Sequence, residues 1–204
     1  MDKILRNTRG SVIYPSFMVG LFSLLLFISI LALIANESLA VQSYTNSIKA
    51  YYLAETGMET TLYGLENAMD KIIFEYLSDL REYKRNYLLE SADNSNKSLK
   101  FSPPQLDTYL KRSLRSEMSL FPLVYKNHVS TYKQEHSCRI SIDYNFKTCI
   151  ITVESIGEYD RARKFLITTL LLPTEQPDGL DSFDLPRIKI QPFQILSYYQ
   201  SLGL

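Results

Sequence analysis

The N-terminal part of the chain divides into a short charged head and a long apolar stretch. Residues 11–36 carry no charge and are dominated by Val, Ile, Leu and Phe. At about 1.5 Å per residue, a helix of roughly 24 such residues is about 36 Å long, which is enough to cross the hydrocarbon core of a bilayer. The pattern therefore predicts a membrane-spanning helix over residues 11–36.

The charges on either side of this stretch predict its orientation. Three basic residues and one acid lie within residues 1–10, and the first charge behind the apolar stretch is Glu37. Basic residues favour the cytoplasmic side of a membrane. We therefore expect a single-pass protein of the plasma membrane, with its N-terminus in the cytoplasm and residues 37–204 outside.

Beyond the apolar stretch the pattern remains helical, but apolar residues now occupy one face. They recur at steps of three and four, the spacing of an amphipathic helix. The members of this stripe are Met58, Leu62, Leu65, Met69, Ile72, Tyr76, Leu80, Tyr83 and Tyr87. The stripe favours a helix that packs on a sheet, and a coiled-coil partner is the alternative.

A helix that ran without interruption over residues 12–90 would be about 120 Å long. We therefore expect a break near Gly57 or Gly64, or past Leu89. The polar run over residues 91–98 is typical of a loop.

The rest of the chain predicts a second, short helix followed by strands. Two prolines open the helix, which we expect over residues 104–118. Alternating apolar positions predict three strands, over residues 138–146, 149–156 and 163–172. The sequence Gly157-Glu158-Tyr159-Asp160 indicates a turn between the last two.

The C-terminal segment is less regular. Residues 173–186 favour an irregular arm, and residues 187–199 favour either an edge strand or a segment lying along the head. A long helix followed by an antiparallel meander predicts an α+β fold, with the helix packed on a small antiparallel sheet. The expected divisions are 1–10 leader, 11–36 membrane or filament-core helix, 37–90 continuation of the helix, and 91–204 extracytoplasmic head with a C-terminal arm.

The net charge limits the classes of partner. The chain has 22 basic and 22 acidic residues. Loss of residues 1–10 would remove three positive charges and one negative charge, so the remainder would carry a net charge of −2. This composition is not typical of a polyanion-binding protein. Without the apolar stretch, roughly 165 residues remain, which is enough for one domain with a modest core.

Three interpretations of the N-terminus are open. A secretory signal peptide would use Ser38-Leu39-Ala40 as its cleavage pattern, but its apolar core would be much longer than usual. A plain single-span anchor would remain uncut. In the third interpretation, which we favour, the charged head that ends in Gly10 is a prepilin-type leader. A peptidase would then cut between Gly10 and Ser11 on the cytoplasmic side, and the apolar helix would stay on the mature protein.

Two segments of the N-terminal quarter resemble pilin families. Arg9-Gly10-Ser11-Val12-Ile13-Tyr14-Pro15 is similar to the start of ComGG-type pseudopilins of Gram-positive competence systems. Ala50-Tyr51-Tyr52-Leu53-Ala54-Glu55-Thr56-Gly57-Met58-Glu59 resembles a segment of PilX-like minor type IV pilins. The resemblance implies a pilin-like fold, processing by a prepilin peptidase, and partners that are other pilin-like subunits, bound through the N-terminal helix.

One position departs from the family pattern. Major pilins carry a glutamate at the fifth residue after the cleavage point, whereas this chain has Pro15 there and no acid before Glu37. In a filament that glutamate pairs with the free amine of a neighbouring subunit, which offsets the cost of its burial. Subunits that lack it, such as the K-type subunit of secretion pseudopili, lie at the tip. Alternatively, Pro15 is simply a proline in the first turn of a helix.

The sequence offers no catalytic motif. It has two histidines, His128 and His136, and lacks H-E-x-x-H, G-x-S-x-G and a glycine-rich phosphate loop. We interpret Ser137 beside His136 as a chance neighbour. The chain is therefore predicted to be no enzyme, to use no cofactor and to take no small-molecule substrate.

Two groups of charged residues are considered as binding sites, one for calcium and one for DNA. Asp178, Asp181 and Asp184 could ligate calcium on a loop, but such clusters are more often solvated turns, so we assign no metal site. Exposed basic residues could contact DNA phosphates, although nearby acids disfavour this. The basic residues are Lys111, Arg112, Arg115, Arg161, Arg163 and Lys164.

The two cysteines, Cys138 and Cys149, lie on neighbouring predicted strands in a compartment that permits disulfides. A bridge requires Cα atoms within about 7 Å. A hairpin turn at Asp143-Tyr144 would place the two cysteines opposite each other. A turn at Lys147-Thr148 would leave Cys138 several residues away along the ladder. Both registers are compatible with the sequence.

Two functions follow from these patterns. The favoured one is a minor pilin-like subunit of a type IV pilus, a competence pseudopilus or a secretion pseudopilus, located at the tip or initiation position and supporting DNA uptake or pilus assembly. After processing it would be associated with the filament. The alternative is an unprocessed, single-span extracytoplasmic binding or sensor protein.

Overall fold

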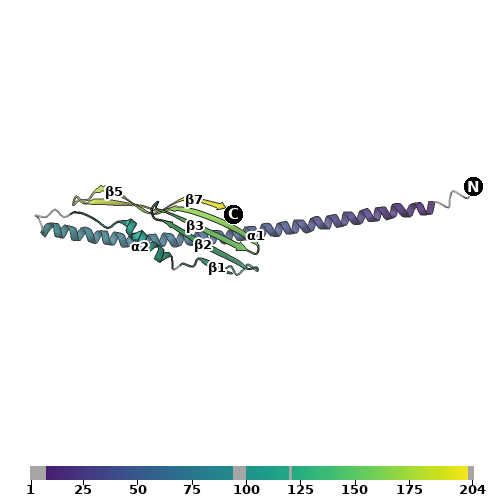
Figure 1. Cartoon of the computed structure of the whole chain (residues 1–204), viewed down its shortest axis with the longest axis horizontal. Coiled ribbons are helices and arrows are strands. Elements are labelled where there is room, and N and C mark those ends of the chain that lie inside the picture. The colour runs from purple at the N-terminus through teal and green to yellow at the C-terminus, as the bar shows by residue number, and fades with distance from the viewer. Residues whose placement is uncertain (1–7, 94–99, 120, 202–204) are drawn as a thin grey trace, which may run out of the picture. The chain divides into compact units, whose positions relative to one another are not determined.

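The chain has the predicted α+β fold, a long helix with antiparallel strands (Figure 1). The computed structural model describes residues 8–93, 100–119 and 121–201. The chain divides into two compact units, Met1–Asn46 and Ser47–Leu204. The helices are α1 (Thr8–Asp93) and α2 (Leu106–Met118). The strands are β1 (Val124–Lys126), β2 (His136–Asn145), β3 (Ile150–Tyr159), β4 (Ala162–Leu171), β5 (Thr174–Leu180), β6 (Pro186–Gln191) and β7 (Gln194–Ser201).

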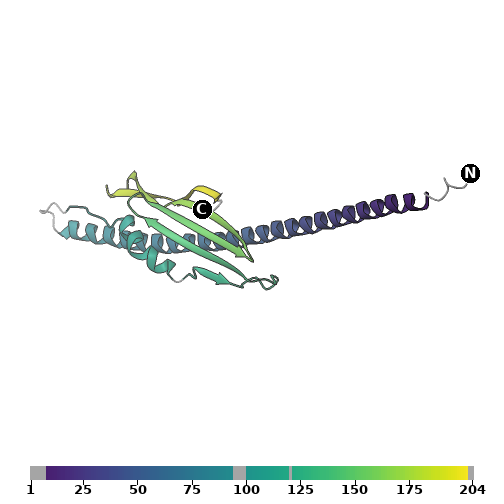
Figure 2. The same cartoon turned by 45° about the vertical axis from the view of Figure 1, so that its right-hand side comes forward.

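The strands of the second unit form two sheets. Five antiparallel strands follow the order β1-β2-β3-β4-β7, and β5 pairs with β6 separately. The three strands expected from alternation are confirmed as β2, β3 and β4, which form a meander of consecutive hairpins. Figure 2 shows this meander crossing the second part of α1.

The core of the second unit lies between α1 and the five-stranded sheet. Met58, Leu65 and Tyr76 of the helical stripe are completely buried, and they share one apolar cluster with Val153 and Leu170 of the sheet. Leu62, Tyr83 and Tyr87 are half-buried at the border of the stripe. The predicted packing of a helix on a sheet is therefore confirmed.

The helix α1 has no break near Gly57 or Gly64. It continues to Asp93 and ends just past Leu89, the last of the expected positions. The two glycines serve close packing instead. A Cβ at Gly57 would lie 2.1 Å from Cys138 Sγ, and one at Gly64 would lie 2.7 Å from the Phe121 ring. The expectation of a break at a glycine was wrong because packing against neighbouring elements outweighs the weak helix propensity of glycine.

The turn expected at residues 157–160 lies slightly later in the chain. Gly157 is inside β3, and the hairpin turns at Asp160 and Arg161, with Asp160 in the left-handed region at φ 55°. A Cβ at Gly157 would lie only 2.0 Å from the carbonyl oxygen of Ala50 on α1. This glycine therefore permits a close approach of helix and sheet rather than a turn.

The C-terminal segment is more regular than expected. Residues 174–180 and 186–191 pair as the β5–β6 hairpin instead of forming an irregular arm, and β7 is an edge strand beside β4. Pro177 and Pro186 are compatible with strands here because both strands of a two-stranded sheet have a free edge. Ile188 and Ile190 of β6 pack against the main core, which explains why the hairpin is held in place.

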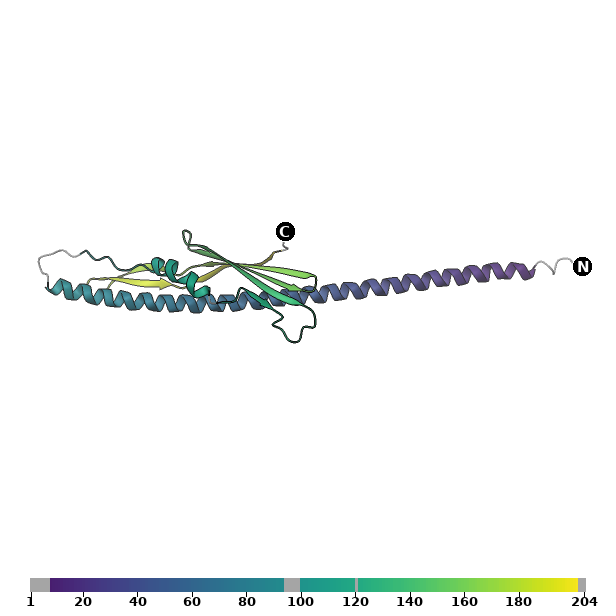
Figure 3. The same ribbon diagram turned by 60° about the horizontal axis from the view of Figure 1, so that its bottom comes forward.

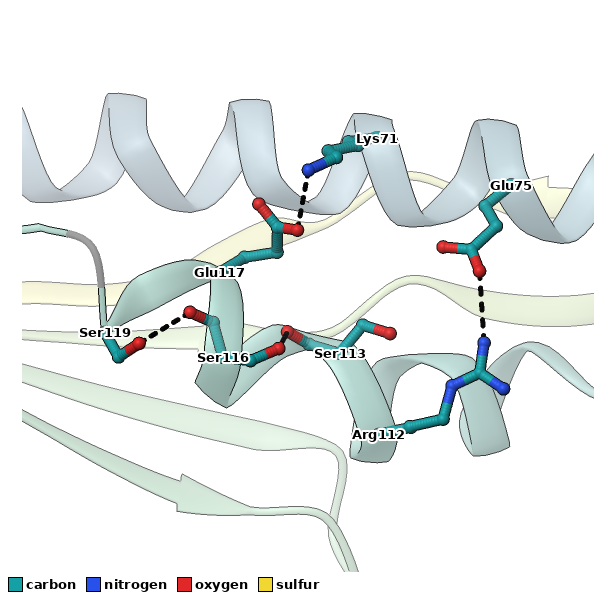
Figure 4. A network of polar contacts seen from close by, with 7 residues as sticks. All are labelled: Lys71, Glu75, Arg112, Ser113, Ser116, Glu117 and Ser119. Atoms are coloured by element: carbon teal, nitrogen blue, oxygen red, sulfur yellow. Dashed lines mark hydrogen bonds and ion pairs between the residues drawn. The ribbon is translucent and has the colours of Figure 1, made fainter.

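The short helix α2 lies beside α1 and next to β5 (Figure 3). Its buried residues are Leu106, Leu110, Leu114 and Met118. Two ion pairs join the helices at their surface: Lys71 Nζ lies 2.7 Å from Glu117 Oε1, and Arg112 Nη2 lies 3.1 Å from Glu75 Oε1 (Figure 4). Exposed pairs contribute at most about 1 kcal/mol each, so burial of the apolar face is the main force that attaches α2.

Candidate functional site: an apolar helix without a covering layer

The first unit presents an apolar helix that is exposed on all its faces. Every described side chain from Ile13 to Thr45 is exposed. This part of α1 is long and apolar enough to span a membrane. A helix that is apolar all round is stable only when something covers it, either lipid or other helices. The region is therefore a candidate membrane span.

Two hydroxyl groups of this region bond to the backbone of their own helix. Ser29 Oγ donates to the carbonyl oxygen of Leu25 at 2.8 Å, and Thr45 Oγ1 donates to that of Val41 at 2.9 Å. In a bilayer core there is no water to satisfy such groups. Ser29 lies within the predicted span, and bonding to the preceding turn of the same helix gives its hydroxyl a partner without water.

The predicted cleavage point lies at the beginning of α1. Gly10 and Ser11 belong to the helix, which begins at Thr8, but their side chains lie outside the described residues. Pro15 is inside α1, beyond the first turn, so its interpretation as a first-turn proline is wrong for the uncut chain. There it removes the hydrogen bond that a residue with an N–H would donate to the carbonyl of Ser11. A chain that begins at Ser11 would have Pro15 close to its helix start, where this loss matters less.

The segment over residues 50–59 has a structural explanation in the second unit. Ala50, Ala54 and Gly57 form a stripe of small residues on the face of α1 that meets β2 and β3. Ser155 Oγ donates to the carbonyl oxygen of Ala54 at 2.7 Å, and Gly157 leaves room for the helix backbone. These residues allow helix and sheet to approach more closely than larger side chains would permit.

The cysteines follow the second of the two predicted registers. The β2–β3 hairpin turns over residues 146–149, so Cys138 pairs with Gly157 while Cys149 lies in the turn. Both thiols are free. The possible disulfide between them is therefore not formed in this structure. Cys138 lies in β2 near the end of the hairpin opposite to the turn that contains Cys149. Burial raises the pKa of the Cys138 thiol, although a hydrogen bond with Ser155 partly opposes this rise.

His136 and Ser137 do not form a catalytic pair. The His136 ring is buried, with Nδ1 2.9 Å from the carbonyl oxygen of Gln134, and Nε2 accepts the N–H of Val129 at 3.0 Å. Ser137 Oγ instead donates to Glu158 at 3.1 Å. Both ring nitrogens are used to hold the loop before β2, which is a structural role.

The aspartates of the β5–β6 hairpin are not gathered around a common point. Lys84 Nζ lies 2.9 Å from Asp181 Oδ2, and the other oxygen of Asp181 accepts the N–H groups of Phe183 and Leu185. The bond with Lys84 lowers the pKa of the Asp181 carboxyl below its ordinary value. Within residues 8–93, 100–119 and 121–201, no group of three potential ligands, Asp178 and Asp184 included, is placed to hold a metal ion.

Most of the basic residues considered for DNA contact have intramolecular partners. Arg112 pairs with Glu75, Lys111 with Asp107, and Arg163 Nε lies 2.9 Å from Glu158 Oε1. The guanidinium of Arg115 lies over the rings of Tyr144 and Phe146, 5.6 Å from each centroid. The structure distributes these groups over α2 and the β3–β4 hairpin rather than joining them into one patch.

One polar cluster was not anticipated from the sequence. Lys49 Nζ lies over the Tyr159 ring, 4.5 Å from its centroid, and donates to the hydroxyl of that residue at 3.2 Å. Tyr132 and His136 complete the aromatic group around Tyr159. Because Lys49 and Tyr159 are far apart in the sequence, no local pattern could have indicated their contact.

Comparison with known proteins gives no match: no family model, no curated protein and no solved structure is significantly similar to this chain.

Proposed function

We propose that this chain is a minor pilin-like structural subunit of a filament that is assembled from the plasma membrane. One observation carries the proposal. The chain joins a basic head ending in Gly10 to an uncharged helix exposed on all faces, and the same helix continues into a head where an antiparallel sheet covers one of its faces. Pilin-like subunits need both parts, one to enter a shared apolar core and one to remain outside it.

The apolar region would act in two environments in turn. Before assembly, lipid covers residues 13–36. After removal of residues 1–10, the helix leaves the bilayer and packs with the helices of other subunits, which offer an equally apolar surface. The transfer requires no large change in the apolar area exposed to water, and this makes the exchange energetically feasible.

The position of Pro15 supports a place at the end of the filament. A chain without a carboxylate there cannot pair with the amine of a neighbouring subunit, and the first acid, Glu37, lies far along the helix. We propose that the subunit initiates or caps the filament, in few copies, within a type IV pilus, a competence pseudopilus that takes up DNA, or a secretion pseudopilus. Uniform immunogold labelling along the shaft would contradict this position.

Gly10→Val tests the processing step on which the proposal depends. A small residue at the scissile bond lets the peptidase approach the backbone, so the variant should remain uncut, membrane-bound and outside filaments. Gly20→Val is the matched control, because a Cβ at Gly20 would meet nothing within 4 Å. This control should be cut normally. Normal assembly of the Gly10→Val variant would refute the proposal and favour the unprocessed binding or sensor protein.

A further inference from the structure

The two edges of the five-stranded sheet differ in how they are protected. The β1 edge has only three residues and includes Lys126, and short strands and lysines are common means of preventing unwanted strand pairing. The β7 edge has eight residues, Gln194–Ser201, and none is charged. In the described part of the chain, no strand pairs with the outer edge of β7 (Figure 1).

The side chains of β7 are unusually apolar for an open edge. Ile195, Leu196, Tyr198 and Tyr199 are each 45–53% exposed. A bulge at Leu196 interrupts the pairing with β4, but residues 197–201 are in regular register with residues 165–169. A regular, uncharged edge strand with exposed aromatic residues is suited to the addition of another strand.

Acidic residues lie beside this edge on the side that faces α1. Tyr198 pairs with Thr168, whose side chain is buried on that side of the sheet. Glu55 follows Ala54, whose carbonyl oxygen accepts a hydrogen bond from Ser155 of β3, so the turn of α1 that carries Glu55 lies over this side of the sheet. Burial raises the pKa of the Tyr198 hydroxyl, and the nearby Tyr51, Glu55 and Glu59 raise this pKa further. Tyr51 donates a hydrogen bond to Glu55 at 3.3 Å. Among the described residues, no basic group forms an ion pair with Glu55 or Glu59.

This arrangement disfavours a second copy of the chain as the occupant. If two β7 strands paired about a two-fold axis, the axis would be perpendicular to the sheets, so both α1 helices would lie on the same face beside the new strand pair. The acids of one copy would then approach those of the other, and like charges at an interface are unfavourable. A strand with basic residues would instead complement them.

We propose that the outer edge of β7 is a docking site for an extended segment of a different protein, which pairs with β7 through its backbone and places a basic side chain near Glu55 and Glu59. The proposal does not depend on the filament function, because an anchored binding protein would present the same edge.

Photo-crosslinking tests the proposal on the full-length protein in the cells that naturally produce it. Benzoylphenylalanine replaces Tyr199 on β7 or, as a control, Val124, which is exposed on β1. We expect the Tyr199 position to crosslink to one segment of a different protein, with Lys or Arg in that segment, as identified by mass spectrometry. Crosslinks to β7 of another copy, crosslinks to a segment without a basic residue, or a yield no higher than that from Val124 would each overturn the proposal.

A charge reversal tests whether the acids beside β7 contribute to binding of the docked segment. Glu59→Lys should reduce the crosslinking yield from Tyr199 about tenfold, because it opposes the basic residue of the partner. Glu82→Lys makes the same change at an exposed acid further along α1 and should leave the yield unchanged. An unaltered unfolding midpoint shows that Glu59→Lys is folded. An equal yield from both variants would overturn the electrostatic part of the proposal.

Discussion

Two regions of α1 are both rich in apolar residues and opposite in how these residues are covered. Over residues 13–45 apolar side chains point in every direction, and all are exposed. Over residues 50–80 they are concentrated on one face, and that face is buried under the sheet and α2. The comparison teaches that a helix can be covered within its own chain when its apolar residues are confined to one face and a polar face remains for water.

The energetic consequence differs between the regions. Burying a Leu or Met side chain contributes about 1.5–3 kcal/mol, and the second region gains this from its own fold. The first region can gain it only from lipid or from other proteins. Under the proposed function, the same driving force stabilises the fold in one region and would drive membrane insertion or assembly in the other.

Introducing charge should have the largest effect and should distinguish the two regions. Leu25→Arg with Ile28→Arg places two charges in the first region, at a cost of roughly 5–7 kcal/mol if both lie near the bilayer centre. We expect loss of the protein from the carbonate-resistant membrane fraction. Phe74→Arg with Leu77→Arg repeats the spacing at exposed positions of the second region and should remain in the membrane fraction. Equal behaviour of the two variants would contradict the comparison.

Removing the close approach of helix and sheet should have the next largest effect. In Gly157→Ala the new Cβ meets the backbone of Ala50 and Ala54, which cannot move without displacing α1. We expect a destabilisation of about 3 kcal/mol or more, measured by urea unfolding of the full chain in detergent micelles.

Gly64→Ala is the matched comparison. The three atoms nearest to its Cβ would all belong to the ring of Phe121, which is half-buried and can rotate, while alanine gains about 1 kcal/mol of helix propensity. We expect the unfolding free energy to change by less than about 1 kcal/mol. A larger loss of unfolding free energy for Gly64→Ala than for Gly157→Ala would contradict the importance of the close backbone contact at Gly157.

Two buried hydroxyls on the same side of the sheet should give small effects of opposite sign. Ser155→Ala loses the hydrogen bond to Ala54 and should destabilise the fold by about 1 kcal/mol. Thr168→Val should stabilise it by about 1 kcal/mol, because Thr168 Oγ1 is buried and lacks a hydrogen-bond partner in the described part of the chain. The difference between their urea midpoints checks both signs, and a loss of stability in Thr168→Val would indicate an ordered water at that hydroxyl.

Periodicity was sufficient to predict the elements that bury an apolar face. The stripe that includes Met58 and Tyr76 and the alternation in β2, β3 and β4 follow directly from side-chain spacing. The roles of Gly57 and Gly157 could not be predicted, because they depend on the contact of segments about 100 residues apart. The β5–β6 hairpin was missed because Pro177 and Pro186 usually interrupt strands, and its contact with the core is not a local property.

The candidate site was predictable to a different degree. The apolar helix and its flanking charges are local features and could be recognised at once. The sequence reduced the register of the β2–β3 hairpin, which decides the separation of Cys138 and Cys149, to two alternatives. The choice between them depended on the pairing of β3 with both β2 and β4. The sequence did not decide whether residues 187–199 form an edge strand, because the order of strands in a sheet depends on tertiary contacts.

The intact mass of the mature protein, purified from the cells that naturally produce it, tests the central claim most directly. The proposal predicts a chain that begins at Ser11, with or without methylation of the new amine, while the apolar helix and the head are retained. A mass that includes Met1 and the rest of residues 1–10 would contradict the pilin-like function, as would a chain that begins after Ala40.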